Sequence, residues 1–269
     1  MNIITVSRGS LTFSQMFSER LSSELGIPLI RREQVFEEAD KYSIRETGFS
    51  DISFIDRAPS VWERQYYRRK HYLLAFQTAL IDLALQGSCI YEGHLGQYLL
   101  TDIPFVLRTR IIQSEEKRIK SHMNLKKLSF DQARIYIKLV DERRRHWSEF
   151  LYGINIEDPR YYDFVVNLEN MGIDSAVKVV SSAVQLPIYN STPGSMSKLK
   201  DLNLVAKAKL YLYLSPKTRG YEVDITADSS KERIVVSGLS STMDADKSEI
   251  LISSVLSSLK GVKTIDYEN

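Results

Sequence analysis

The sequence of 269 residues has a net charge of +2 at neutral pH, and 26% of its residues are charged. This length is sufficient for two domains, and the nearly balanced charge gives no specific signal for binding nucleic acid. The single cysteine, Cys89, excludes an internal disulfide, and because we find neither a signal peptide nor an apolar run of membrane-spanning length, we expect a cytoplasmic protein.

The first 26 residues predict a strand, a short loop and a helix. Residues 3–6 read Ile-Ile-Thr-Val, and apolar residues then recur every three or four positions as far as Gly26. A helix that begins just after a strand directs its free N–H groups and its dipole at the loop between them. This unit therefore has the general geometry of an anion-binding site.

The loop at residues 7–15 lacks the chemistry of a phosphate-binding loop. Such a loop needs several glycines and a lysine, whereas this one has one glycine and no lysine. Thr12 and Gln15 instead have the spacing of a capping box, which satisfies the first N–H groups of the helix internally. Arg8, Thr12 and Ser14 remain candidates for contacting a phosphate.

Strands and helices are predicted to alternate from Gly26 to residue 184. We expect strands at residues 27–30, 89–91, 105–112 and 161–167, and helices at residues 32–42, 60–87, 114–123, 129–151 and 174–184. Residues 43–59 show no periodicity and are expected to form a loop over a site or a mobile segment. The alternation predicts an α/β fold with a mostly parallel sheet and right-handed crossovers.

Polar residues near the ends of two predicted strands are candidate ligand contacts. Open α/β sheets bind ligands at the carboxyl ends of their strands, where this chain has Glu92, Gly93 and His94. His94 could act there, although a lone histidine more often completes a local hydrogen bond. Arg108 and Arg110 are predicted to share one strand face, which requires an anion or a carboxylate between them.

Basic residues outnumber acidic residues between Arg108 and Arg145. Many of them lie on the two predicted helices at residues 114–123 and 129–151, which flank a turn. A solvated helical face is the simpler interpretation. The alternative is a lid whose arginines close on phosphate groups.

The pattern changes after a polar segment at residues 188–197, which has the composition of a linker. The following residues predict a small α+β sandwich with helices on one face of its sheet. The expected order is helix 198–214, strands 221–227 and 233–237, helix 244–259 and strand 262–267. This second unit contains no predicted catalytic cluster.

Residues 2–187 resemble the cytidylate-kinase-like family of P-loop nucleoside monophosphate kinases. The resemblance is carried by residues 4–8 with Leu21, Leu25 and 26–28, by 92–94, by 114–118, by 141–147, and by 158–163 with Asn167. It implies a three-layer fold with a parallel sheet and a helical lid over residues 1–187. It also implies a nucleotide or phosphorylated small molecule as partner, and ATP and Mg²⁺ as cofactors wherever phosphoryl transfer persists.

The matching positions imply roles for individual residues. The catalytic candidates, all in the lid helices, are Arg118, Asp141 and Arg144. The cofactor-binding candidates are Arg8, Thr12, Ser14, Arg110 and His94. No residue set is predicted to bind a metal ion by itself.

The chain also departs from the family pattern at several positions. Residues 11–14, Leu-Thr-Phe-Ser, stand where the family has Gly-Ser-Gly-Gly, and Gln15 replaces a basic residue. Further departures are Arg31 at a commonly acidic position and His94 and Ser121 at positions where arginine is common. Because losing one cationic group can cost on the order of 10³-fold in such a reaction, we expect kinase turnover to be lost or very slow.

The second unit, residues 198–269, resembles a BON domain through residues 221–225, 233–238 and 261–265. BON domains bind membranes or hydrophobic ligands, so the resemblance implies contact with a protein partner, a ligand or a membrane surface. Our leading hypothesis is thus a degenerate kinase-like protein that binds a phosphorylated ligand through its lid arginines.

Two alternatives remain open. One is an active CMP-type kinase that uses ATP and Mg²⁺, with phosphates neutralised by arginines and Thr12 or Ser14 approaching the metal. The other is a non-catalytic assembly protein whose arginines form a solvated face, and the sequence is compatible with a homo-oligomer. Substituting Arg118 and Arg144 should leave both binding and turnover unchanged only in the assembly protein.

Overall fold

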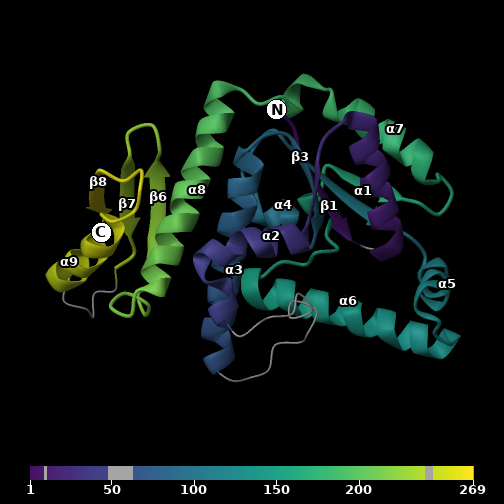
Figure 1. The fold of residues 1–269 in the computed structure, drawn as a ribbon, viewed down its shortest axis with the longest axis horizontal. Coiled ribbons are helices and arrows are strands. Elements are labelled where there is room, and N and C mark those ends of the chain that lie inside the picture. Colours follow the sequence, from purple (N-terminus) through teal and green to yellow (C-terminus); the bar gives the residue numbers. More distant parts are fainter. Residues whose placement is uncertain (9–10, 48–62, 240–244, 269) are drawn as a thin grey trace. The chain divides into compact units, whose positions relative to one another are not determined.

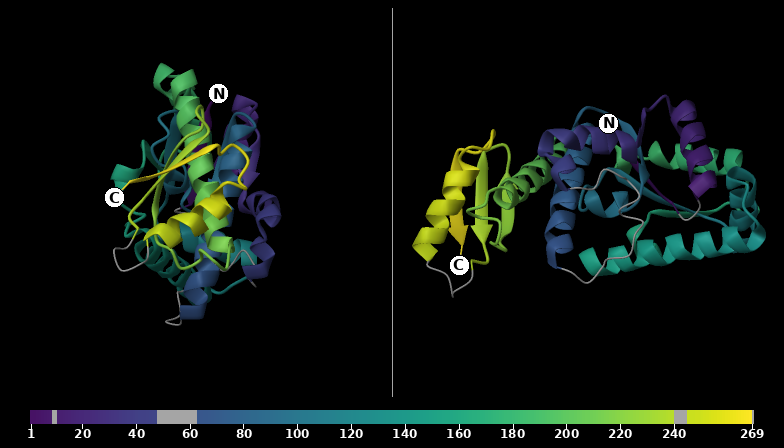
Figure 2. Two further views of the ribbon diagram at one scale, coloured as in Figure 1. Left: turned by 90° about the vertical axis from the view of Figure 1, so that its left-hand side faces the viewer. Right: turned by 60° about the horizontal axis from the view of Figure 1, so that its bottom comes forward.

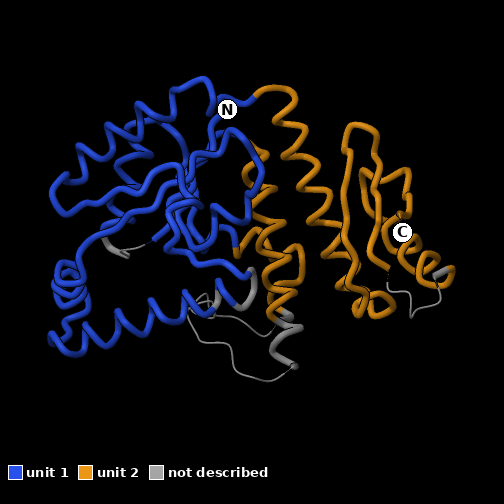
Figure 3. Tube along the Cα trace, turned by 180° about the vertical axis from the view of Figure 1, so that it is seen from behind, with its two compact units in different colours: residues 1–35, 49–65, 87–191 blue, residues 36–48, 66–86, 192–269 orange. Residues whose placement is uncertain are grey.

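The computed structural model describes residues 1–8, 11–47, 63–239 and 245–268, without the side chains of residues 11–12, 46–47, 63–68, 147, 150–152 and 245 (Figure 1). The chain forms two compact units, shown in Figure 3. The first comprises residues 1–35, 49–65 and 87–191, and the second residues 36–48, 66–86 and 192–269. The second unit therefore includes two segments that precede residue 187.

The first unit contains the expected parallel sheet. Its strands are β1 (Ile3–Arg8), β2 (Leu29–Arg31), β3 (Cys89–Gly93), β4 (Val106–Ile112) and β5 (Phe164–Asn167). They lie in the order β2-β3-β1-β4-β5, and every neighbouring pair is parallel. The central strands β1 and β3 are buried almost throughout, which explains their nearly continuous apolar runs.

Two helices cover one face of this sheet, α1 (Leu11–Leu25) and α7 (Ile173–Val184). They lie side by side in Figures 1 and 2. Their apolar faces meet strand residues in one core formed by Ile4, Val6, Phe17, Leu21, Ile90, Leu107, Ile111, Val166, Leu168, Ala176, Val177, Val180 and Val184. This packing holds α1, which begins three residues after the end of β1, against the sheet.

The two predicted lid helices form a hairpin. Helix α5 (Glu115–Lys126) packs against α6 (Phe130–Tyr152) through a small core of Ile119, Ala133 and Ile137. The predicted capping box at the start of α6 is confirmed, because the side chains of Ser129 and Gln132 each accept the other's backbone N–H. The first unit also contains the short helix α4 (Gly96–Leu99) and the start of α2 (Arg32–Glu38).

The second unit has its own sheet of three strands, in the order β6-β7-β8. Its main elements are α3 (Glu63–Leu85, from residue 66), α8 (Pro193–Leu214), β6 (Asp224–Asp228), β7 (Arg233–Ser237), α9 (Ala245–Leu256) and β8 (Thr264–Glu268). Strands β6 and β7 are antiparallel, and β7 and β8 are parallel. From α8 onward, the order of helices and strands is the predicted one.

A partly buried carboxylate joins α3 to α8 within the second unit. Asp82 accepts hydrogen bonds from the hydroxyl of Tyr42 and from Asn203 Nδ2, at 2.8 Å for the latter, and Lys207 Nζ lies 2.9 Å away. These partners keep the pKa of Asp82 below its ordinary value, although burial acts in the opposite direction. Asp82 therefore stays ionised and helps to hold the two helices together.

The structure corrects some local predictions. Residues 193–197, predicted as linker, form the first turn of α8, because Thr192 caps this helix and Pro193 suits its first position. Helix α1 begins at Leu11, so Thr12 lies inside the first turn and the predicted capping box with Gln15 is wrong. The predicted loop at residues 43–59 contains a 3₁₀ helix at Ile44–Thr47, and the rest lies outside the described residues.

Among the helices of the described residues, none combines the length and apolar character needed to cross a membrane.

Candidate functional site

The candidate site lies at the carboxyl ends of the central strands. Strand β1 pairs with β3 on one side and with β4 on the other, so the chain order along the sheet reverses beside β1. Ligands of open parallel sheets bind at such reversals, outside the carboxyl ends of the strands. Here the strand ends bring Arg8, Glu92, His94 and Arg110 to one edge.

A buried carboxylate, Glu92, neutralises the arginine at the end of β1. Its side chain is 1% exposed, and the Nε atom of Arg8 lies 3.0 Å from its Oε1. Arg31, opposite Glu92 on β2, places its Nε 4.0 Å from Oε2. Burial raises the pKa of Glu92 above its ordinary value, while the charges of Arg8 and Arg31 lower it.

His94 lies fully inside this edge and is surrounded by positive charge. Its Nε2 atom is 3.4 Å from the hydroxyl of Ser148 on α6. Burial is the main reason that its pKa lies well below the ordinary value, and the charges of Arg144, Arg32, Arg110 and Arg8 act in the same direction. His94 is therefore neutral at physiological pH and adds no charge to the site.

This environment predicts a pH-dependent stability. The unfolded chain binds a proton at His94 near pH 6.5, whereas the folded chain does not, so the free energy of unfolding should fall as pH decreases below that value. The limiting slope from one such group is about 1.4 kcal/mol per pH unit. Urea unfolding of the wild type and of His94→Gln at pH 7.5, 6.5 and 5.5 measures this contribution. Equal slopes in the two proteins would show that folded His94 also takes up the proton.

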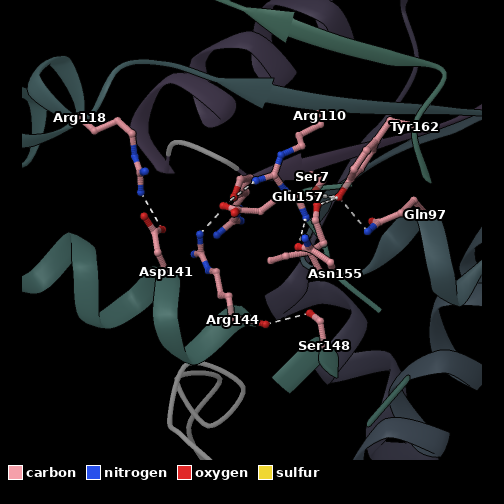
Figure 4. A network of polar contacts seen from close by, with 12 residues as sticks. Ser7, Gln97, Arg110, Arg118, Asp141, Arg144, Ser148, Asn155, Glu157 and Tyr162 are labelled. Atoms are coloured by element: carbon pink, nitrogen blue, oxygen red, sulfur yellow. Dashed lines mark hydrogen bonds and ion pairs between the residues drawn. The ribbon is translucent and has the colours of Figure 1, made fainter. Parts of the chain in front are cut away.

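The hydroxyl of a tyrosine helps to hold Arg110 in place (Figure 4). Its Nη1 atom donates to the carbonyl of Ile156 at 2.7 Å and to the hydroxyl of Tyr162 at 3.4 Å. The Tyr162 hydroxyl also lies 3.3 Å from Ser7 Oγ and accepts from Gln97 Nε2 at 3.0 Å. This network is buried, and it fixes the Arg110 guanidinium at the carboxyl half of β4.

The lid helices contribute the other cations. Arg144 of α6 is 6% exposed and donates from Nη1 to the backbone carbonyl of Arg8 at 3.2 Å. Arg118 of α5 donates to Asp141 of α6 at 2.7 Å, and the pair faces across the hairpin in Figure 4. Arg144 therefore connects α6 to the end of β1. Asp141 holds Arg118 against the same helix.

The remaining predicted residues have different positions. Ser14 is fully buried in α1, and no hydrogen-bond partner of its hydroxyl lies among the described residues. The side chain of Thr12 lies outside the described residues. Arg108 does not share the site with Arg110, because its guanidinium donates to the carbonyls of Leu100, Ile103 and Val106 in the segment leading into β4.

The sequence placed Glu92 at a strand end without giving it a role of its own, and three further residues at this edge were not among the candidates: Gln97, Ser148 and Tyr162. Glu92 carried a detectable signal, because an acidic residue at the end of a strand as buried as β3 requires a positive partner. The other three act through contacts with residues far away in the sequence, which no local pattern indicates.

The residues at this edge of the sheet suit the phosphate groups of ATP better than they suit a Mg²⁺ ion. Guanidinium groups suit phosphate oxygens, because their planar set of donors matches the geometry of a phosphate. Within the described part of the chain, no three acidic, histidine or cysteine side chains come together as a metal site. The described residues therefore fit the phosphate groups, and they provide no metal site formed by protein side chains alone.

Comparison with known proteins identifies related sequences. The model of the cytidylate kinase-like family matches residues 3–170. Cytidylate kinase from Thermococcus kodakarensis is 24% identical over 126 residues, which cover 45% of this chain and 62% of that protein. Cytidylate kinase from Saccharolobus islandicus is 27% identical over 124 residues, covering 44% of this chain and 60% of that protein. The match thus spans less than two thirds of the length of these curated relatives.

A solved structure shares the fold. An uncharacterised protein from Eubacterium ventriosum has a TM-score of 0.51 and 18% sequence identity, and the match covers 68% of this chain and 97% of that one. This similarity concerns the arrangement of the sheet and its helices.

Proposed function

We propose that this chain, which belongs to the cytidylate kinase-like family, binds a nucleotide or another phosphorylated ligand with the arginines at the edge of its parallel sheet. The observation that carries the proposal is the position of Arg8, Arg110 and Arg144 around a histidine that is itself neutral. Guanidinium groups from three elements at one edge of the sheet offer planar sets of donors, which match the oxygens of a phosphate group. Glu92 lies 3.0 Å from Arg8, and the exposed Glu157 lies 3.6 Å from Arg110.

Each arginine has a separate role in this proposal. Arg110, fixed by Tyr162, is a rigid donor at the base of the site. Arg144 comes from the lid and lies beside the backbone of Arg8, so it would hold the lid against a bound phosphate. Arg118 is restrained by Asp141 at 2.7 Å and would neutralise a phosphate group nearer the α5–α6 hairpin.

We further propose that phosphoryl transfer is lost or weak. Transfer depends almost entirely on positioning and on neutralising charge, and this chain has Leu-Thr-Phe-Ser in place of the glycine-rich segment of the family. The second candidate is an active CMP-type kinase that uses ATP and Mg²⁺. It is favoured by the similarity of this chain to proteins named cytidylate kinase.

Isothermal titration tests the binding proposal. We expect the wild-type chain to bind ATP or CMP, in buffer with Mg²⁺, with a dissociation constant below about 1 mM, equivalent to at least 4 kcal/mol. A ligand with no phosphate, cytidine, is the control and should bind at least about tenfold more weakly. Absence of heat with both nucleotides at millimolar concentration would contradict the proposal.

For residues 198–269 we propose a BON-like role in contacting a partner, a hydrophobic ligand or a membrane surface. In support, the helices and strands follow the order α8-β6-β7-α9-β8. A hollow of about 600 Å³ between α9 and β8 is lined by residues that include Ile250, which is 69% exposed. Sedimentation of the full chain with phospholipid vesicles tests the membrane contact, and a supernatant that retains all the protein would argue against it.

A further inference from the structure

Glu92 combines deep burial with incomplete hydrogen bonding. It is the next-to-last residue of β3, its side chain is 1% exposed, and it lies between β1 and β2. Neither carboxylate oxygen has a hydrogen-bond donor in suitable geometry among the described residues, although Arg8 Nε approaches Oε1 to 3.0 Å. Buried carboxylates in permanent ion pairs normally receive several hydrogen bonds. Arg8 also donates from Nη2 to the backbone carbonyl of Glu92 at 3.5 Å. The carboxylate itself is held to Arg8 by charge, and this part of the contact can be exchanged.

The partner of Glu92 is a residue of the proposed anion site. Arg8 ends β1, immediately before the loop that leads into α1. Arg144 donates to the Arg8 carbonyl at 3.2 Å, so an anion that reaches Arg144 is also next to Arg8. The charges of Arg144 and Arg8 both act on the buried His94, so an anion at Arg144 is within electrostatic reach of the Arg8 guanidinium. Such an anion and the Glu92 carboxylate would compete for that guanidinium.

The charged groups that face Glu92 come from four elements. Arg8 of β1 and Arg31 of β2 attract its negative charge, whereas Glu19 of α1 and Glu33 of α2 repel it. Arg31 also pairs with Glu19, and this pairing weakens the attraction between Arg31 and the Glu92 carboxylate. His94, which follows the last residue of β3, is neutral.

We propose that Glu92 is a built-in counter-ion of the anion site, which determines how tightly a phosphate group binds by competing with it for Arg8. This inference rests on the proposed function and adds a specificity-determining residue to it. A neutral Glu92 releases Arg8 to the ligand. Because the pKa of Glu92 is above its ordinary value, the carboxylate should gain its proton at a higher pH than an exposed glutamate does. Ligand affinity should therefore increase as pH falls.

Inorganic sulfate is the probe, because it remains a dianion from pH 8 to pH 5.5 and the protein alone titrates. Titration at constant ionic strength should show that wild-type affinity increases as pH falls over this range. Glu92→Gln should bind sulfate about tenfold more tightly than the wild type at pH 8, because the neutral amide leaves Arg8 available. Its affinity should depend less on pH.

Glu157→Gln is the matched control. Glu157 also pairs with an arginine of the site, Arg110, at 3.6 Å, but its side chain is 53% exposed. Solvent already weakens this pair, so neutralising Glu157 should change sulfate affinity less than twofold.

The outcomes separate this inference from the proposed function. Equal sulfate affinities of wild type and Glu92→Gln at pH 8 would overturn the counter-ion role while leaving the anion site intact. A wild-type affinity that does not change with pH would also overturn it, and this measurement needs no variant. Failure of both proteins to bind sulfate, ATP or CMP at any pH would instead overturn the proposed function.

Discussion

Arg144→Gln is expected to weaken the binding of ATP or CMP by on the order of 10- to 100-fold, because hydrogen bonds to charged groups contribute about 1.5–3 kcal/mol each. Arg144 is 6% exposed and joins the lid helix α6 to the backbone of Arg8. Glutamine retains much of the length of the side chain but removes the charge that a phosphate needs. Isothermal titration with each nucleotide measures the loss.

Arg134→Gln provides a control on the same helix. Arg134 has a 49% exposed side chain and pairs with the exposed Asp131 at 3.6 Å. Both variants lose one positive charge from α6, so a general effect of net charge would weaken binding equally in the two proteins. Thermal unfolding should accompany the titrations, because Arg144 is buried and its loss also affects the fold. An equal loss of affinity in both variants would favour the alternative in which the arginines of α6 form only a solvated face and bind no phosphate.

Local sequence patterns predicted the elements of this fold well where each element depends on its own residues. The alternation of apolar runs with helical periodicity predicted the parallel sheet, and Ser129 with Gln132 predicted the start of α6. A capping box requires only residues three apart, so the sequence contains all of its information. Local patterns failed at residues 193–197, which were predicted as linker, because Pro193 suits both a linker and the first turn of a helix.

The site was harder to predict because its contacts are long-range. Alternation along β4 placed Arg108 and Arg110 on one face, but the segment before β4 folds back and supplies Arg108 with three backbone carbonyls. The pairing of Glu92 with Arg31 follows from the register between β2 and β3, whose residues lie about 60 positions apart in the sequence. No single-sequence pattern contains that register.

Phosphoryl transfer by the wild-type chain is expected to be at least about 10³-fold slower than the 1–100 s⁻¹ typical of kinases. Residues 11–14, Leu-Thr-Phe-Ser, include no glycine, so we expect the backbone N–H groups of this turn to be less accessible to phosphates than those of a glycine-rich loop. A coupled assay of ADP release, with CMP as acceptor and with ATP and Mg²⁺ in excess, measures the rate. Turnover of 1 s⁻¹ or more would favour the active CMP-type kinase.

Phe13 packs against the hydrophobic core, so replacing it with glycine is expected to destabilise the fold. Its side chain is partly buried against the core that α1 and α7 form on the sheet. Removing a buried aromatic side chain typically costs about 3–5 kcal/mol, and a partly buried one costs less. We therefore expect Phe13→Gly to lower the free energy of unfolding by about 2 kcal/mol without restoring measurable ADP release. A gain in turnover in this variant would show that the bulk of Phe13 alone blocks transfer, whereas an unchanged rate places the defect in several missing groups together.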